Sequence, residues 1–363
     1  MRVAIHQSTT GGRPATFDVP KLDALTGIRF LAALFVFVFH YGAGYASRHG
    51  ADAPFVNVLR HGFIGVSLFF VLSGYILTYN YRERSATRGW VRQFLVARFA
   101  RIYPLYILIL LIALPLVISK LTWLTALRVL SMTQSWTTPG NEMGNSWVMQ
   151  AWTLSVELAF YLIFPILIGP VVRLGIARAT LLLALVAVGI VVLASPTIAP
   201  GTSTHASIGW ISLAPIPLFR LPEFLFGMLL CQLSFIAPRF VSLLAGNALA
   251  TALIAAILCV LSVDSTKYVL ALATLLSGLF IVNLTGRVGL ISAILSSQLL
   301  LLLGGASYAL YLCQNPVREW LRLIGSQRAE QFANPLVALV LSIILFTYWE
   351  SPMRKAILRI LRS

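Results

Sequence analysis

The sequence contains few charged residues. Only 10% of its 363 residues are Asp, Glu, Lys or Arg, whereas a typical soluble domain contains about 25%. Because 59% of the residues are hydrophobic, the chain has too little polar side-chain material to cover a soluble globule of this size. This composition excludes an ordinary cytosolic enzyme and predicts an integral membrane protein, in which each spanning helix takes about 20 apolar residues.

Cysteine is also scarce. Cys231, Cys259 and Cys313 each lie inside an apolar run, and their spacing matches neither a zinc site nor a redox pair. We therefore expect all three to be buried and inert, and we predict no metal site. A cleavable signal peptide is not expected either, because the first apolar run begins only near Ile28, after a polar stretch.

Long hydrophobic runs are what the sequence has in abundance. They predict an all-α, polytopic transmembrane bundle of about ten helices. The candidate spans are residues 28–44, 63–81, 102–118, 148–168, 181–194, 213–236, 243–263, 268–284, 297–313 and 335–349. They divide the chain into an N-terminal cytoplasmic segment (1–27), a transmembrane domain (28–350) and a basic cytoplasmic tail (351–363).

The basic residues indicate the orientation of the chain. It carries 27 Lys and Arg against 11 Asp and Glu, a net charge of +16. With the N-terminus inside, most of the 27 flank the spans on the cytoplasmic side, and the positive-inside rule then places both termini in the cytoplasm. In a membrane protein the excess positive charge is explained by topology, so we expect no nucleic acid partner.

Five ionisable residues fall within predicted spans or at their ends. Each costs roughly 2.5 to 3.5 kcal/mol at the centre of a spanning helix and needs a compensating interaction. The five are Arg29, His40, Glu157, Glu223 and Glu350. We expect Glu223 to pair with Arg220 at i, i+3, and Glu350 to bond locally or to cap a neighbouring helix, and we assign no chemistry to these three.

Arg29 and His40 lie about three helical turns apart in the first span. Their spacing places them about 20° from the same face and about 16 Å apart along the helix axis. A structural interpretation has Arg29 extending to the interface and His40 making an interhelical hydrogen bond. A functional interpretation is equally compatible with this geometry.

Arg98 and Arg101 stand at the cytoplasmic end of the third span. Their i, i+3 spacing puts both guanidinium groups on one helical face. Paired guanidinium groups suit phosphate oxygens. A basic cytoplasmic loop also serves orientation or binds anionic lipid, and this alternative stays open.

Glu157 shares a helical face with Thr153 and Tyr161. A carboxylate at this depth needs a partner, and the candidates are a buried His or Arg. An ion pair that joins two helices explains Glu157 nearly as well as a catalytic role does.

Several segments together resemble the integral-membrane acyltransferase-3 family, over residues 21–354. The fragments are LDALTGIRFLAALFVFVFH, GFIGVSLFFVLSGYIL, FLVARFARIYPLY, WTLSVELAFYLIFP, RLPEFLFGMLL, SYALYL and YWESPMR. Each is weakly specific by itself, whereas their order and spacing together are specific. Two positions depart from the family pattern: Gln314 stands where many relatives have His, and Ser67 where members often have Asp.

The resemblance implies a bacterial inner-membrane O-acyltransferase. Such an enzyme moves an acyl group, often acetyl, from cytoplasmic acyl-CoA to a hydroxyl of an extracytoplasmic carbohydrate such as an exopolysaccharide or O-antigen. His40 is the candidate general base, because imidazole accepts protons best near neutral pH. Glu157 is the candidate group that orients this imidazole or positions the acceptor. Arg29, Arg98 and Arg101 are the candidates for binding the acyl-CoA phosphates.

The expected partners follow from the same resemblance. They are acyl-CoA as donor, a carbohydrate or lipid-linked glycan as acceptor, membrane lipid and polysaccharide-assembly proteins, with no metal and no tightly bound cofactor. Two other functions remain open. A transporter would use the intramembrane Arg, His and Glu to line a pathway, and a passive subunit of an assembly complex would leave the spacing of Arg29 and His40 unexplained.

Overall fold

The computed structural model describes residues 21–136, 147–194, 215–263, 268–325 and 327–360. Within these ranges the regular structure is helical and contains no strand, which confirms the all-α prediction. The longer helices are α1 (Asp23–Arg48), α3 (Ile64–Tyr81), α4 (Trp90–Val117), α6 (Trp152–Val172), α7 (Ile176–Ala194), α8 (Ile216–Ile236), α10 (Asn247–Ser262), α11 (Val269–Thr285), α13 (Gln298–Ile324) and α14 (Gln327–Leu345). The shorter ones are α2 (Ala53–Arg60), α5 (Trp123–Leu130), α9 (Pro238–Leu244), α12 (Leu290–Leu295) and α15 (Ser351–Ile360).

Seven helical segments of the described chain are long and apolar enough to cross a membrane, and α9 with α10, bent by 73°, would form an eighth span. The predicted count of ten therefore remains a prediction, as does the cytoplasmic position of the termini. α11 is a shorter apolar helix, and α13 is less apolar because it contains Gln298, Gln314 and Asn315. The predicted boundary at residue 350 falls inside a continuous helical segment, Ala333–Ile360.

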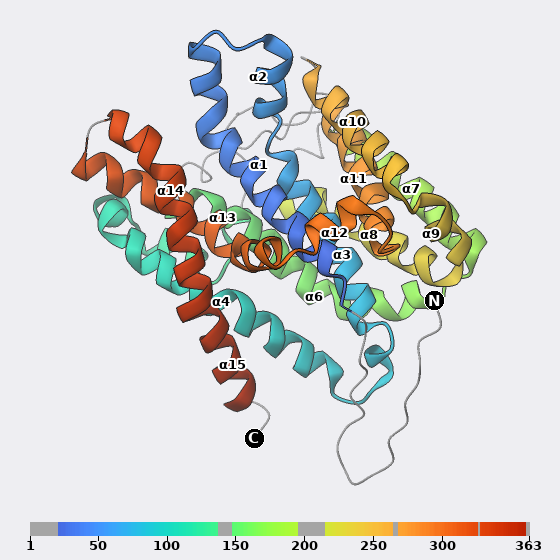
Figure 1. Ribbon diagram of the computed structural model, residues 1–363. Coiled ribbons are helices and arrows are strands. Elements are labelled where there is room, and N and C mark those ends of the chain that lie inside the picture. The colour runs from blue at the N-terminus through green and yellow to red at the C-terminus, as the bar shows by residue number, and fades with distance from the viewer. Residues whose placement is uncertain (1–20, 137–146, 195–214, 264–267, 326, 361–363) are drawn as a thin grey trace.

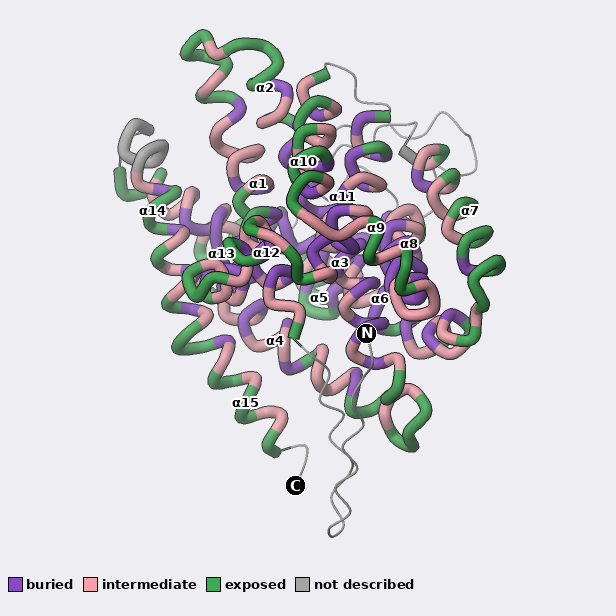
Figure 2. The backbone as a smooth tube through the Cα atoms, turned by 45° about the vertical axis from the view of Figure 1, so that its right-hand side comes forward, coloured by how far each residue is buried: buried purple, intermediate pink, exposed green. Residues whose placement is uncertain are grey.

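The centre of the bundle is the crossing of α3 and α8. A Cβ on Gly74 would collide with the carbonyl oxygen of Phe224, and one on Gly227 would collide with that of Val71. Glycine at these two positions lets the two backbones touch, which is how helices pack closely in a bilayer. Figure 2 shows burial concentrated around α3, α6 and α8, whereas the outward side of α7 is exposed.

α13 packs between α1 and α14. α1 and α14 both pack along α13 but have little contact with each other, and they lie on either side of it in Figure 1. α2 and α15 lie at opposite ends of the bundle.

The cysteines are only partly as expected. Cys231 and Cys313 are buried, but Cys259 is exposed, so the prediction is wrong for Cys259. Its position on α10 faces away from the bundle, and an apolar run does not reveal which of its faces packs against other helices.

Candidate functional site

Four of the five predicted site residues line one inner cavity of about 110 Å³. Arg29 comes from α1, Arg98 and Arg101 from α4, and Glu157 from α6. α3 and α13 supply aromatic and hydroxyl side chains to the same cavity. The structure thus brings together three cations and one carboxylate that lie far apart in the sequence.

Arg98 is held among aromatic rings. Its guanidinium carbon lies 5.9 Å from the ring centroid of Tyr81 and 5.8 Å from those of Phe94 and Tyr161. Such cation–π contacts fix the direction of a guanidinium group. Its buried Nε atom has no hydrogen-bond partner in the described part of the chain. Arg98 is therefore a positioned residue rather than a loop charge that only sets topology.

Arg101 of α4 faces Glu350, which lies between α14 and α15. Its Nη1 atom lies 3.8 Å from Oε1 of Glu350, whose side chain is 3% exposed. Glu350 ends a π-helical turn, Phe346–Glu350, between α14 and α15, and π-helical turns often occur at functional sites. Within the described ranges, Arg101 Nη2 and Glu350 Oε2 are buried without hydrogen-bond partners. The expectation of a local bond or cap for Glu350 missed this contact, because α4 is distant in sequence.

Arg29 and Glu157 belong to the same electrostatic group. Arg29 lies close enough to Arg101, Glu157 and Glu350 to interact with all three. The carboxylate of Glu157 accepts a hydrogen bond from the hydroxyl of Tyr161, one turn further along α6. Thr153, Glu157 and Tyr161 all line the inner cavity, as their shared helical face predicts.

His40 lines a separate, outer cavity of about 1130 Å³ between α1, α13 and α14. Its ring centroid lies 4.9 Å from that of Phe39 and 6.1 Å from that of Tyr41. The guanidinium carbon of Arg318 on α13 lies 5.0 Å from the ring centroid of Tyr41. Arg318 is thus the cation next to His40, and it lies beyond the end of the predicted span 297–313.

The structure does not place Glu157 next to His40. The two residues line different cavities, and the hydrogen bond of Glu157 in the described chain is with Tyr161. The described contacts therefore give no support to an orienting role for Glu157, and its alternative role of positioning the acceptor stays a prediction. The hydrophobic runs predict that both residues lie within the bilayer, but they do not show which helix faces contact each other.

The two cavities lie back to back. Arg29 lines the inner cavity and the next residue, Phe30, lines the outer one; Tyr311 lines the inner cavity and Leu310 the outer one. Phe69 and Tyr311 contact each other in the wall, with ring centroids 6.3 Å apart. Side chains on α1, α3 and α13 therefore stand between the inner cavity with its arginines and the outer cavity with the imidazole.

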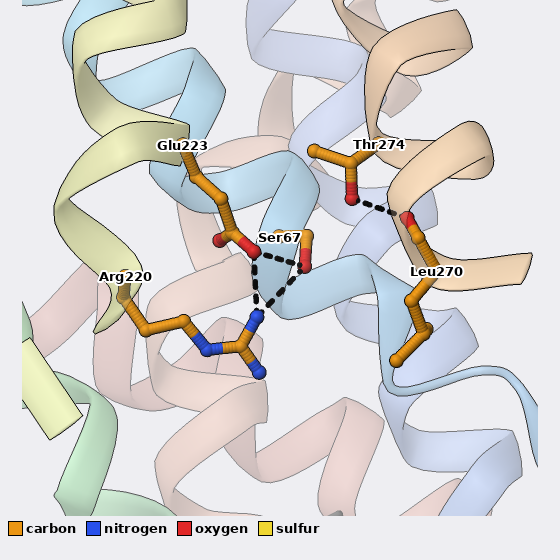
Figure 3. A network of polar contacts seen from close by, with 5 residues as sticks. All are labelled: Ser67, Arg220, Glu223, Leu270 and Thr274. Carbon is orange, nitrogen blue, oxygen red and sulfur yellow. Dashed lines mark hydrogen bonds and ion pairs between the residues drawn. The ribbon is translucent and has the colours of Figure 1, made fainter. Parts of the chain in front are cut away.

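A third polar group ties α3 to α8 (Figure 3). Arg220 Nη1 donates to Glu223 Oε1 at 2.6 Å and to Ser67 Oγ at 3.3 Å, and Ser67 donates to the same carboxylate at 3.1 Å. The predicted pairing of Arg220 with Glu223 is confirmed. Thr274 stays outside the group, since its hydroxyl bonds to the carbonyl of Leu270 in its own helix. Ser67 was missed as a member, although its departure from the family pattern was the available signal.

Gln314 stays within its own helix. Its Nε2 atom donates to the carbonyl oxygen of Tyr311 at 2.9 Å, and the side chain is fully buried. Across the described residues, no group of three or more His, Cys, Asp and Glu is placed to hold a metal ion.

The sequence is similar to a known protein family and to individual known proteins. Residues 22–349 match the family described as acyltransferase domain. The chain is 36% identical over 161 residues to acyltransferase MdmB of Streptomyces mycarofaciens, a stretch that covers 41% of this chain and 39% of that protein. It is 28% identical over 169 residues to peptidoglycan O-acetyltransferase OatA of Listeria monocytogenes, which covers 40% of this chain and 24% of that protein.

A third relative is "Protein 2 in picA locus" of Rhizobium radiobacter. The identity is 40% over 88 residues, which is 23% of this chain and 39% of that protein. The chain thus spans less than half the length of each of these curated relatives in the matched regions. No solved structure matches.

Proposed function

Because the chain belongs to the acyltransferase-3 family, we propose that it is an acyl-CoA-dependent O-acyltransferase of the bacterial inner membrane. It transfers an acyl group, in the simplest case acetyl, to a hydroxyl of an extracytoplasmic carbohydrate such as an exopolysaccharide or O-antigen. The observation that carries the proposal is the pair of cavities along α1 and α13, one lined by three arginines and the other by His40.

The inner cavity is the donor side in this proposal. Arg29, Arg98 and Arg101 offer planar guanidinium groups, which bind phosphate oxygens in pairs. A volume of about 110 Å³ is too small for a whole nucleotide, so the adenosine of acyl-CoA lies toward the cytoplasm. Glu157 and Glu350 hold the arginines in place before the donor binds, so less ordering remains to be done on binding.

The outer cavity is the acceptor side. His40 takes the proton from the acceptor hydroxyl as its oxygen attacks the thioester carbonyl. The carbon–oxygen bond forms, the carbon–sulfur bond breaks, and the CoA thiolate leaves and takes up a proton. The thioester reaches His40 by passing the wall that contains Phe69 and Tyr311. Direct transfer needs neither a metal nor a tightly bound cofactor.

The test follows thioester cleavage and acyl transfer together. The full chain in lipid nanodiscs receives acyl-labelled acetyl-CoA and extracted membrane glycans, and both thiol release and label in the glycans are measured. His40→Ala lowers transfer at least about 100-fold, the effect of losing a general base. The control is His49→Ala, since His49 is exposed, lines neither cavity, and contacts Tyr45 through that residue's carbonyl oxygen and by stacking of the two rings.

Two results contradict the proposal. Transfer at the wild-type rate by His40→Ala, at equal protein abundance, removes the general-base role. If the wild-type protein carries a solute across the membrane and cleaves no thioester, it is a transporter. The transport pathway would then run through the same arginines and His40.

A further inference from the structure

The outer cavity is lined by cations. Arg48 of α1 and Arg318 and Arg322 of α13 all face it, and the described residues that line it include no Asp or Glu. Glu319 pairs with Arg322 at 3.0 Å, but it is not among the lining residues. The neutral sugars of a carbohydrate offer hydroxyl groups, which need carboxylate or amide acceptors as much as donors, and Asn334 is the single amide among the described lining residues. Three guanidinium groups favour an anion instead.

Two of these arginines are arranged by depth. Arg318 and Arg322 stand one turn apart on the same face of α13. Arg318 is half-buried and rests on the ring of Tyr41, the neighbour of His40. Arg322 is exposed at the mouth. An anionic group that passes Arg322 therefore reaches Arg318 beside the imidazole.

Apolar side chains of α1 and α14 form much of the remaining wall of the cavity. Leu34 of α1 is 38% exposed and Leu336 of α14 is 66% exposed, and both line the cavity. These two helices pack on α13 with little contact between them, and Figure 1 shows them on either side of it. Exposed apolar side chains therefore border the cavity, and its volume of about 1130 Å³ slightly exceeds the usual range for ligand sites.

We propose that the outer cavity binds an acceptor that carries a phosphate group on a lipid anchor. Arg318 and Arg322 bind the phosphate, the lipid chain lies between α1 and α14, and the sugar next to the phosphate presents its hydroxyl to His40. This inference rests on the proposed function and adds the chemical class of the acceptor. A soluble polysaccharide would use neither the apolar opening nor the arginine pair.

The experiment measures binding without turnover. The full chain in neutral maltoside detergent is titrated with dodecyl phosphate, with dodecanol and with inorganic phosphate, and the shift of the thermal unfolding midpoint gives each affinity. We expect dodecyl phosphate to bind most tightly. Arg318→Gln weakens this binding at least about tenfold, because a charge-assisted contact is lost, and Arg322→Gln weakens it less. Arg60→Gln, an exposed arginine of α2 outside the cavity, leaves it unchanged.

The variants also deal with misfolding. Arg318→Lys keeps the charge and retains part of the affinity, while Arg322→Gln changes an exposed residue and preserves the fold. Equal affinity for dodecanol, or no effect of Arg318→Gln in a folded protein, overturns the inference. Inorganic phosphate that binds as tightly as dodecyl phosphate overturns the lipid anchor. The binding titration contains no acyl-CoA, so its outcome is independent of thioester cleavage. If dodecyl phosphate does not bind while thioester cleavage proceeds, this inference is wrong. If dodecyl phosphate binds while thioester cleavage fails, the proposed function is wrong.

Discussion

The two cavities share α1 and α13 as walls, but they hold their arginines in opposite ways. In the inner cavity Arg98 lies among three aromatic rings and Arg101 faces a carboxylate that is 3% exposed. In the outer cavity Arg322 pairs with Glu319 at the surface, where both side chains are 41% exposed. The arginines of the inner cavity are therefore fixed by their neighbours, whereas Arg322 of the outer cavity is solvated and Arg318, half-buried on Tyr41, lies between these extremes.

The difference matches two kinds of ligand. The inner cavity, at about 110 Å³, is small and prearranged, as suits a donor whose phosphate groups never vary. The outer cavity, at about 1130 Å³, is open and only partly prearranged, as suits an acceptor of larger size. In the proposed mechanism, acceptor specificity can thus change through the lining of the outer cavity without disturbing the inner one.

The largest expected effect concerns the two ion pairs. Glu350→Gln leaves Arg101 buried beside an uncharged group, and breaking a buried pair in this way costs about 3–5 kcal/mol. Glu319→Gln costs less than about 1 kcal/mol, because an exposed pair is screened by solvent. The shorter distance in the exposed pair, 3.0 Å against 3.8 Å, does not reverse this order.

Unfolding in mixed micelles at increasing denaturant measures both variants against the wild type. If Glu350→Gln and Glu319→Gln lowered the free energy of unfolding equally, the arginines of the two cavities would not differ in how firmly they are held. A Glu350→Asp variant serves as control, since it keeps the charge and shortens only the side chain.

The next effect concerns substrate dependence. Replacing Arg98 and Arg101 together by Gln removes two charge-assisted contacts to phosphate, each worth about tenfold, so the KM for acyl-CoA rises about 100-fold. Arg318→Gln leaves this KM unchanged, because Arg318 lies on the other side of the wall. Steady-state thiol release at varied acyl-CoA measures both. If Arg318→Gln raised the KM for acyl-CoA by the same factor, both cavities would belong to one donor site.

Much of the fold follows from the sequence because the bilayer constrains it. Spanning segments must be helical and apolar, so hydrophobic runs locate them. The ends are less certain: the predicted ninth span stops at Cys313, where polar residues begin, but α13 continues to Ile324. Arg318 is therefore beyond the end of the predicted span, although it lies on the helix and faces the cavity of His40.

The site could be predicted only in part. Helical spacing placed Glu157 with Tyr161, and both line the inner cavity. Spacing within one helix says nothing about which helices meet, so the contact of Glu350 with Arg101 was missed. For the same reason the sequence does not decide whether Glu157 orients His40, positions the acceptor or pairs with an arginine, and the structure places it near Arg29.

The smallest expected effect compares two tyrosines. Tyr161→Phe keeps the ring beside Arg98 but removes the hydroxyl that donates to Glu157. A half-buried carboxylate that loses a donor costs about 1–2 kcal/mol, at the lower end of the range for buried groups, so kcat/KM for acyl-CoA falls about tenfold. Tyr41→Phe keeps the ring under Arg318, and its kcat/KM stays within about twofold of the wild type, because Phe also supports a cation–π contact.

Measured side by side, these variants test whether hydroxyl groups matter only where the arginines are fixed. A larger loss in Tyr41→Phe than in Tyr161→Phe would mean that the outer cavity is the more tightly arranged of the two. The rings themselves are the control: Tyr161→Leu and Tyr41→Leu remove the surface on which each arginine rests. Each should lower activity further than the matching Phe variant does, because dispersion and cation–π contacts are lost together.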